Sequence, residues 1–331
     1  MPAPDHHRPG GGFRNPWPSA ELHGFADFLK WTLIERRRNP RRPDPDPSKF
    51  SLSDPSFVVP RATPERLTLT WVGHTSFLIQ IAGLNVLTDP VWSQRASPLQ
   101  FIGPRRWVPP AIDFDRLPPI DVVVLSHDHY DHLDATTISR LAERYPAIVW
   151  YAPLELGAFL KQRGARDVNE RDWWQDGSIG QLQLTCVPAQ HFSGRTLGRR
   201  NRTLWSGWVL RSEEHSVFFA GDTALHPEFA TIGRRCGPFD LAILPIGAYE
   251  PRWFMGAVHM NPEDCIKAFT ELASTQNGQR LIMAAAHWGT FKLTDEPMDE
   301  PPGMMRALWK QSQFKDGDLW IMRHGETRSV G

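Results

Sequence analysis

The chain has 331 residues, a formal net charge of zero and 40% hydrophobic residues, a composition typical of a globular protein. No run reaches the roughly 18 apolar residues that a membrane span needs. The polar start, residues 1–12, lacks the apolar core of a secretory signal, so a cytoplasmic location is expected. The balanced charge disfavours nucleic acid as a partner. Three widely separated cysteines, Cys186, Cys236 and Cys265, exclude a disulfide framework.

The first 66 residues differ in character from the rest. Residues 1–15 show no periodicity and predict a disordered or loosely attached tail. Ser19 to Arg38 reads as a helix with a broad apolar face and an arginine-rich end, and the proline-rich residues 39–64 predict an extended connection. We expect residues 16–66 to pack on a compact domain that spans 67–331. The apolar helix face could instead contact a membrane surface or a second subunit in a homodimer.

Strand-like apolar runs alternate with helical segments after residue 67. No linker interrupts them, which predicts an α/β domain in which two β-sheets are sandwiched between helices. The expected helices are Ala135 to Arg144, Leu154 to Arg163 and Pro262 to Ser274. The expected strands are Leu67–Val72, Phe77–Ile81, Val86–Leu87, Val122–Leu125, Ile148–Tyr151, Leu182–Val187, Val217–Ala220, Leu241–Pro245 and Leu281–Ala285.

Three histidines and two aspartates lie within six residues directly after the strand Val122–Leu125. The run is His127-Asp128-His129-Tyr130-Asp131-His132. Alternate residues of an extended loop project the same way, so His127 and His129 can grip one ion while Asp131 and His132 face a second. Imidazole nitrogen with carboxylate oxygen suits zinc, with iron or manganese as alternatives. A merely solvated polar loop is the less favoured interpretation.

Three later polar residues follow apolar strands in the same way. His191 comes after Leu182–Val187, Asp222 after Val217–Ala220, and His287 after Leu281–Ala285. Each alone is more often a solvated loop residue than a ligand. Together they complete two coordination shells.

This pattern resembles the metallo-β-lactamase superfamily, whose members carry HxHxDH, a later histidine, a bridging aspartate and a last histidine. More narrowly, the chain resembles the N-acylphosphatidylethanolamine-hydrolysing phospholipase D family, above all in the stretch Gly247 to Met255. Other matching stretches are Asn15–Pro18, Thr88–Pro90, Arg95–Pro98, Gly103–Arg106, Leu117–Asp121, Gly237–Leu241, His287–Thr290 and His324–Glu326.

The resemblance implies an αβ/βα sandwich of two mixed β-sheets flanked by helices, with the hydrolase domain at 67–331, and two bound metal ions. It implies that His127, His129 and His191 hold one zinc, that Asp131, His132 and His287 hold the other, and that Asp222 bridges. His259 matches a further family histidine near the reacting centre. Asp131, Asp222 and His259 are thus the expected catalytic residues.

The implied reaction is hydrolysis of N-acylphosphatidylethanolamine to N-acylethanolamine and phosphatidic acid, at or near a membrane surface. The alternative is a lactonase or another hydrolase of the same fold that acts on a soluble substrate. A degenerate site that serves only for binding is a further, weaker alternative, because all seven ligands are present.

Substrate contacts are expected from four residues: His74, Arg195, Tyr249 and Arg252. His74 could equally be a buried, hydrogen-bonded histidine, and the arginine loop that begins at Arg195 could be a solvated basic loop. Asp89, which ends a strand, either orients a ligand histidine or starts a turn.

Overall fold

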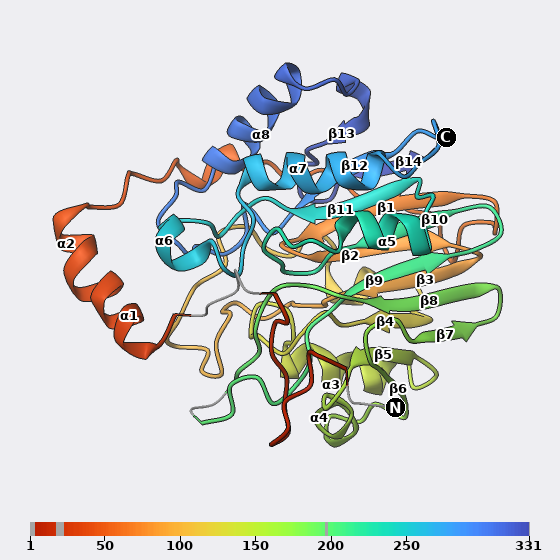
Figure 1. Ribbon diagram of the computed structural model, residues 1–331. Helices are drawn as coiled ribbons and strands as arrows, with labels where there is room; N and C mark the ends of the chain where they lie inside the picture. Colours follow the sequence, from red (N-terminus) through yellow and green to blue (C-terminus); the bar gives the residue numbers. More distant parts are fainter. Residues whose placement is uncertain (1–3, 18–22, 196–197, 331) are drawn as a thin grey trace.

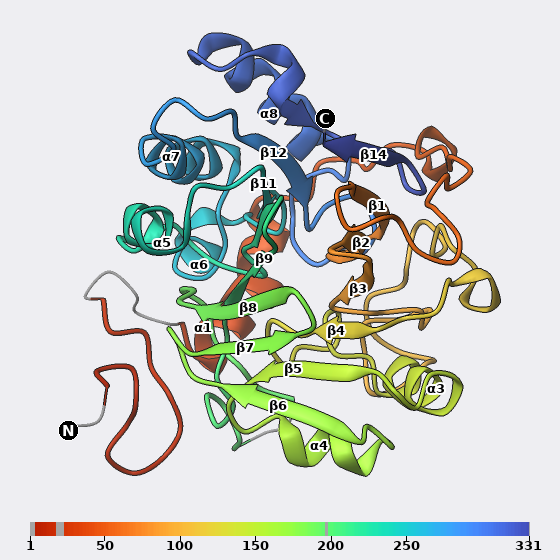
Figure 2. The same ribbon diagram turned by 90° about the vertical axis from the view of Figure 1, so that its right-hand side faces the viewer.

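The computed structural model describes residues 4–17, 23–195 and 198–330. Two seven-stranded sheets lie face to face, and helices cover their outer faces (Figures 1 and 2). The first sheet has the order β14-β1-β2-β3-β4-β5-β6, and the second has the order β13-β12-β11-β10-β9-β8-β7. This is the predicted sandwich, and the expected fold class is confirmed.

The strands of the first sheet are β1 (Leu67–Gly73), β2 (Ser76–Ile81), β3 (Leu84–Thr88), β4 (Val122–Val124), β5 (Val149–Pro153), β6 (Asp167–Arg171) and β14 (Thr327–Val330). Those of the second sheet are β7 (Asp176–Ile179), β8 (Leu182–Val187), β9 (Gly207–Arg211), β10 (Ser216–Phe219), β11 (Leu241–Pro245), β12 (Ile282–Ala286) and β13 (Leu319–Trp320). The α-helices are α1 (Phe25–Leu29), α2 (Arg36–Arg38), α3 (Ala135–Arg144), α4 (Gly157–Gln162), α5 (Phe229–Cys236), α6 (Arg252–Met255), α7 (Pro262–Ala273) and α8 (Glu300–Gln311). A π-helical segment, η1 (Lys30–Glu35), joins α1 to α2, and short 3₁₀ turns cover Pro47–Lys49, Phe114–Arg116 and Asp316–Asp318.

Three apolar layers hold the sandwich together. The central layer lies between the sheets, where Trp71 and Phe77 of the first sheet share a cluster with Trp208 and Phe219 of the second. A second layer packs α3 and α4 on the outer face of the first sheet. A third packs α5, α7 and α8 on the outer face of the second. Burial of both faces explains why β4, β11 and β12 read as continuous apolar runs rather than alternating ones.

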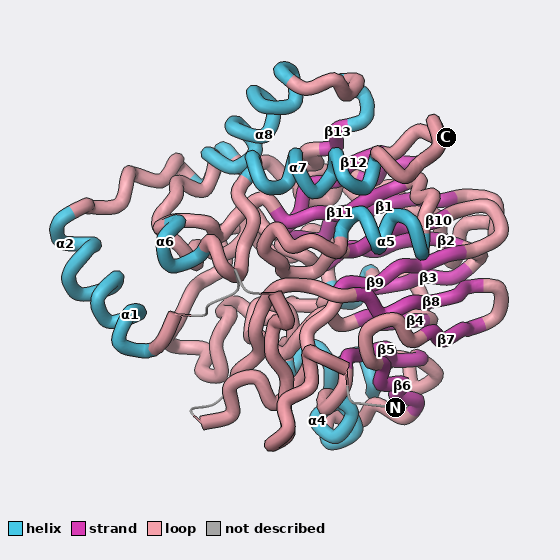
Figure 3. Tube along the Cα trace, viewed as in Figure 1, coloured by secondary structure: helices cyan, strands magenta, loops and turns pink. Residues whose placement is uncertain are grey.

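Each sheet contains a parallel half. The pairs β3-β4, β4-β5 and β5-β6 are parallel in the first sheet, as are β10-β11, β11-β12 and β12-β13 in the second. Parallel strands bring their carboxyl ends to one edge, and loops gather at one end of the sandwich, beside α1 and α2 (Figure 3). The polar residues that follow β4, β8, β10 and β12 are therefore brought toward one another.

The N-terminal helix is shorter and less regular than predicted. Helical structure runs from Phe25 to Arg38 and passes through a π-helical segment, whereas the expected start, Ser19 to Leu22, lies outside the described residues. Trp31 is the buried residue of η1. Its indole Nε1 donates to Asp295, which also accepts from Arg36 and Arg41, so one carboxylate anchors this helix to the domain.

The expectation of a loose tail over residues 1–15 needs correction for residues 4–15, whereas residues 1–3 lie outside the described part of the chain. Residues 4–17 fold against the domain, and Phe13 inserts into the central apolar layer with 4% of its surface exposed. His6 and His7 bond to Asp172, and Asn15 bonds to the backbone of His191. The aromatic and histidine side chains of a proline- and glycine-rich stretch thus supply contacts that periodicity cannot reveal.

The connection between the helix and β1 also packs on the core, as expected. Ser53 N donates to His324 O over 2.8 Å, and Val58 N donates to the side chain of Gln80 over 2.8 Å. Within the described part of the chain, no helix combines the length and apolarity that crossing a bilayer demands.

Strand β8 offers an internal test of the central layer, because Leu184 is fully buried between the sheets while the neighbouring Gln183 is exposed. Leu184→Ala is expected to lower the free energy of unfolding by about 2–5 kcal/mol, through lost burial and the cavity left behind. Gln183→Ala is expected to change it by less than about 0.5 kcal/mol. Urea unfolding followed by circular dichroism measures both, and equal losses would contradict the assigned register of β8.

Candidate metal centre

The histidine-rich loop is fixed at both ends. Strand β4 precedes it, and α3 begins just after it with Asp134 as N-cap, whose side chain accepts from Thr136 N. The same carboxylate also accepts from Ser93 N over 2.9 Å. The loop therefore leaves a buried strand, turns across the end of the sheet and enters a capped helix, which leaves little freedom for its side chains.

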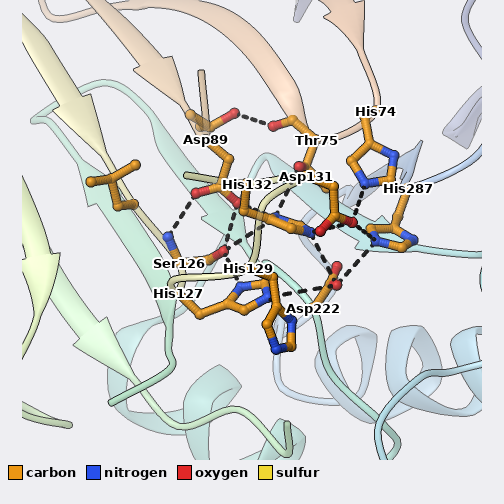
Figure 4. A network of polar contacts seen from close by, with 12 residues as sticks. His74, Thr75, Asp89, Ser126, His127, His129, Asp131, His132, Asp222 and His287 are labelled. Atoms are coloured by element: carbon orange, nitrogen blue, oxygen red, sulfur yellow. Dashed lines mark hydrogen bonds and ion pairs between the residues drawn. The ribbon is translucent and has the colours of Figure 1, made fainter. Parts of the chain in front are cut away.

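Three imidazoles converge in a first cluster. His127 Nε2 lies 2.9 Å from His129 Nδ1, and His191 Nε2 lies 3.1 Å from the same nitrogen (Figure 4 shows the first pair). The loop after β4 contributes two of these rings and the loop after β8 contributes the third. The sequence predicted this grouping, and three nitrogens that face a common point are the geometry of a first ligand shell.

A second cluster combines Asp131, His132 and His287. Asp131 Oδ2 lies 3.4 Å from His132 Nε2 and 3.5 Å from His287 Nε2. His74 joins this group, since its Nε2 lies 2.9 Å from the same oxygen.

The carboxylate of Asp222 lies between the two clusters. Its Oδ2 is 3.0 Å from Nε2 of both His132 and His287, and 3.8 Å and 4.0 Å from Nε2 of His191 and His127. Its Oδ1 is buried without a hydrogen-bond partner. A carboxylate with one oxygen facing two groups of imidazoles has the position expected of a bridging ligand.

The electrostatics of the clusters suit cations. Burial, reinforced by neighbouring imidazoles, lowers the pKa of His129 to about 3 and that of His127 well below its ordinary value. For Asp222, burial is outweighed by the surrounding histidines, and the pKa falls well below the usual range. Neutral imidazoles around an ionised carboxylate are the protonation states that metal ligands require.

His132 and His287 show the opposite shift. Burial disfavours their charged forms, but the nearby carboxylates of Asp222 and Asp131 outweigh it and raise the pKa of His287 to about 9 and that of His132 well above its ordinary value. Nε2 of each ring is also buried without a hydrogen-bond partner. Positive charge is thus favoured beside these carboxylates, and a divalent cation can supply it in place of protons. The nitrogen and oxygen donors fit two such ions.

A ring of outer hydrogen bonds orients the candidate ligands. Asp89 Oδ2 accepts from His132 Nδ1 over 2.7 Å, so this aspartate orients a histidine as well as ending β3. Asp89 is held in turn by Ser126, whose backbone N and Oγ both donate to it. His191 Nδ1 donates to Val258 O over 2.9 Å. Such partners fix the tautomer and the direction of each ring.

His259 lies beside the clusters, with its Nδ1 3.9 Å from Asp222 Oδ2 and without a hydrogen-bond partner. Its backbone carbonyl accepts from Arg252 Nη1 over 3.0 Å, and Arg252 also binds Asp264 in the first turn of α7. Arg252 therefore places the His259 loop and is absent from the described residues that line the cavity, and its expected contact with substrate stays a prediction.

The other expected substrate contacts also have partners within the chain. His74, 1% exposed, bonds to Asp131, and Tyr249 donates its hydroxyl to Glu300 over 2.8 Å; neither lines the cavity. Arg195 does line it, but its Nη1 donates to the carbonyl oxygens of Asp128 and Leu133. A guanidinium bound to backbone carbonyls in this way anchors its loop, so Arg195 is not a freely solvated side chain, and its contact with substrate stays a prediction.

A cavity of about 670 Å³ opens above the two clusters. His129, Asp131, Asp222 and His259 form its floor. Its walls are mainly apolar and include Phe25, Phe28, Trp31, Phe192, Phe254, Met255, Val258 and Leu293. Sequence patterns had not connected these wall residues with the site, although the aromatic face of the N-terminal helix was visible.

Comparison with known proteins agrees with this geometry. Residues 84–288 match the Beta-lactamase superfamily domain. The chain is 42% identical over 278 residues to an uncharacterized protein of Mycobacterium tuberculosis, which covers 83% of this chain and 71% of that protein. It is 40% identical over 272 residues to N-acyl-phosphatidylethanolamine-hydrolyzing phospholipase D 1 of Caenorhabditis elegans, which covers 78% of this chain and 75% of the nematode protein.

Solved structures share the fold at lower identity. A metallo hydrolase from the archaeon Ignicoccus hospitalis superposes with a TM-score of 0.59 at 20% identity, over 80% of this chain and 99% of the other. An isothiocyanate hydrolase from Delia radicum gut bacteria gives a TM-score of 0.62 at 20% identity, over 79% and 98%. The chain is thus a metal-dependent hydrolase that belongs to the metallo-β-lactamase superfamily and, within it, to the family of the N-acyl-phosphatidylethanolamine-hydrolysing phospholipases D.

Proposed function

We propose that the protein is a dinuclear zinc phosphodiesterase that hydrolyses N-acylphosphatidylethanolamine to N-acylethanolamine and phosphatidic acid. The observation that carries this proposal is the junction of the two ligand clusters with a largely apolar cavity. A soluble, polar substrate would gain little binding energy from walls made of Phe28, Trp31 and Phe254. Acyl chains can bury their methylenes there, and each buried methylene contributes about 0.8 kcal/mol. The 40% identity to the nematode phospholipase supports the same substrate class.

The proposed ligand sets follow the two clusters, with His127, His129 and His191 in one and Asp131, His132 and His287 in the other. Asp222 is the proposed bridge. Two zinc ions held there supply Lewis acidity that neutralises charge on the phosphoryl oxygens and lowers the pKa of water. Iron or manganese would satisfy the same donors.

The chain's own residues orient the reacting groups. His259 is the proposed partner of the leaving alcohol, because its ring lies on the cavity floor with Nδ1 unbonded. Burial lowers the pKa of His259 well below its ordinary value, so the ring is neutral. Its Nδ1 can then form one hydrogen bond with the leaving oxygen. Arg252 keeps this ring in place through the His259 carbonyl.

The N-terminal helix is the proposed contact with the lipid surface. Many of its outward side chains are apolar, with Phe25 67% and Leu33 53% exposed, the charged side chains of Asp27 and Lys30 lie among them, and three arginines follow at 36–38. Apolar residues beside cations favour the interface of an anionic bilayer. The same helix lines the cavity, so a lipid drawn from the surface would enter beside it. This gives a cytoplasmic enzyme that binds membranes peripherally.

Asp89→Asn is expected to weaken metal binding and turnover about 10- to 100-fold, because it removes the charge that orients His132. Zinc retention against a graded chelator and initial hydrolysis rates measure the two effects. The matched control is Asp115→Asn, since Asp115 is an exposed aspartate that pairs with Arg144. If Asp89→Asn loses half of its zinc at the same chelator concentration as the wild type, Asp89 does not help to hold the metal ions.

The substrate is tested with zinc-loaded enzyme on vesicles that contain N-acylphosphatidylethanolamine, with mass spectrometry of both products. We expect release of N-acylethanolamine with phosphatidic acid, and a loss of more than about 100-fold in Asp222→Asn, because a bridging ligand should matter more than an outer partner. A soluble aryl phosphodiester and an acyl lactone are assayed in parallel. Turnover of either soluble compound without turnover of the lipid would refute the lipid assignment and leave the hydrolase standing.

Phe25→Ser and Phe28→Ser are each expected to reduce binding to anionic vesicles about 10- to 100-fold, through the loss of about 1.5–3 kcal/mol of apolar burial. Co-sedimentation measures the partition independently of catalysis. Phe25→Leu, which keeps an apolar side chain, should bind nearly as well as the wild type. If the serine variants sediment with vesicles to the same extent as the wild type, the helix is not the membrane contact.

A further inference from the structure

The N-terminal strap, defined as residues 4–17, is a folded segment with its own hydrogen bonds. Arg14 N donates to His6 O over 2.8 Å, and Arg8 N donates to Gly12 O over 3.0 Å. Gly12 has a φ of +79°, and a Cβ there would lie 2.4 Å from Asn201 O. The backbone therefore requires glycine at this point, where the strap meets the loop that carries the candidate ligand His191.

The strap reaches the metal centre through Asn15. The Asn15 amide donates to His191 O over 2.9 Å and accepts from Trp205 Nε1 over 3.1 Å. Phe13 N donates to Asn201 O over 2.8 Å, ten residues beyond His191. Anything that fastens the strap also steadies the backbone of this ligand.

The strap is fastened by a third group of histidines and carboxylate, remote in sequence from the ligands assigned above. His6 Nε2 lies 2.6 Å from Asp172 Oδ1, and His7 Nε2 lies 2.8 Å from Asp172 Oδ2. The His6 ring stacks on Trp173 with centroids 4.2 Å apart, and Trp173 N donates to Asp172 Oδ1. Both side chains of the His6–Asp172 pair are therefore held in place before any ligand arrives.

The charge at this group is uncompensated by basic side chains. Among the residues that the structure describes, no lysine or arginine lies within ion-pair distance of Asp172. A partly buried anion between two imidazoles is a site where a cation gains more than it would at an open surface.

We propose that His6, His7 and Asp172 bind a further divalent transition-metal ion, Zn²⁺ in the first instance, separate from the dinuclear centre. The ligand atoms lie within 4.8 Å of one another, and two imidazole nitrogens with a carboxylate are a zinc ligand set. The His7 side chain is 29% exposed, which leaves an approach from solvent and positions for water ligands. The ion would take the place of the Nε2 protons that now face the carboxylate, each neutral ring then carrying its proton on Nδ1, and it would pin the strap to the turn between β6 and β7.

An ion at this site would stabilise the strap and would take no part in the hydrolysis. The ion would tie the strap to the domain, and Asn15 would then hold the His191 carbonyl more rigidly. The inference does not rest on the proposed function, since it holds whatever substrate the dinuclear centre takes.

The test compares zinc content and strap protection in wild type, His7→Ala and Asp222→Asn. His215→Ala is the matched control, because His215 also lies beside one aspartate, Asp240 at 3.6 Å, but has no second histidine there. After dialysis against micromolar Zn²⁺, metal analysis should find one ion fewer per chain in His7→Ala than in wild type or His215→Ala. Zinc should also slow hydrogen exchange of residues 4–17 in Asp222→Asn, where the dinuclear centre is impaired, but not in His7→Ala.

Two results would overturn the proposal. Equal zinc content in wild type and His7→Ala would show that no ion binds at the strap. Strap protection that is the same in the zinc-free and the zinc-loaded wild type would show that hydrogen bonds to Asp172 alone fasten it. Loss of activity on every phosphodiester would leave both readouts unaffected, so the two proposals fail separately.

Discussion

The carboxylate of Asp222 is the constraint on which the site depends. It is almost fully buried, and an isolated ionised carboxylate in such a place would cost several kcal/mol. The fold compensates by directing Nε2 of His132 and His287 at the same oxygen over 3.0 Å, with the first cluster about 4 Å away. The raised pKa values of His132 and His287 show that protons can balance this carboxylate, and cations shared between the two clusters can take their place. The histidines that surround this carboxylate come from loops between the end of β4 and the end of β12.

Part of the backbone around that carboxylate is strained, which shows how strongly the surroundings determine it. His74, Asp89 and His287 have φ values of +57°, +34° and +60°, in a region that costs non-glycine residues about 1–3 kcal/mol each. Each is held by a specific bond: His74 N donates to Thr290 Oγ1, His287 N donates to His74 O, and the Asp89 side chain accepts from Ser126. His74, held in this way, reaches the centre through Asp131, 2.9 Å from its Nε2.

The sequence revealed the candidate ligands because each follows an apolar strand, and β4, β10 and β12 are buried on both faces, whereas β8 before His191 keeps an exposed Gln183. Such strands give uninterrupted apolar runs, and the polar residue at the end of each run is conspicuous, as at Val122–Val124 before His127. Apolar runs did not reveal β6 and β7, because the residues of these strands are half-buried or exposed and mostly polar. Helix α8 was missed because prolines at its first turn resemble a loop. The strap escaped notice for a different reason: its order comes from long-range contacts of Phe13, His6 and Asn15, which leave no local periodicity.

Substrate contacts were the least predictable part of the site, and the reason is physical. A ligand histidine has to reach its ion, whereas an arginine or a tyrosine can satisfy its donors with any nearby carbonyl or carboxylate. Arg252 donates to His259 O, and the Tyr249 hydroxyl donates to Glu300. Both side chains therefore stabilise the structure around the site. The surfaces that face substrate are instead supplied by segments outside the strand framework, the helix at 25–38 and the loop at Phe192. The helix is joined to the core through Asp295 and through the packing of Trp31 on Ala248, Met255 and Val258, whereas the Phe192 loop also carries the candidate ligand His191. The hydrolytic centre is thus supplied by the loops at the strand ends, and a large part of the apolar wall by the helix at 25–38.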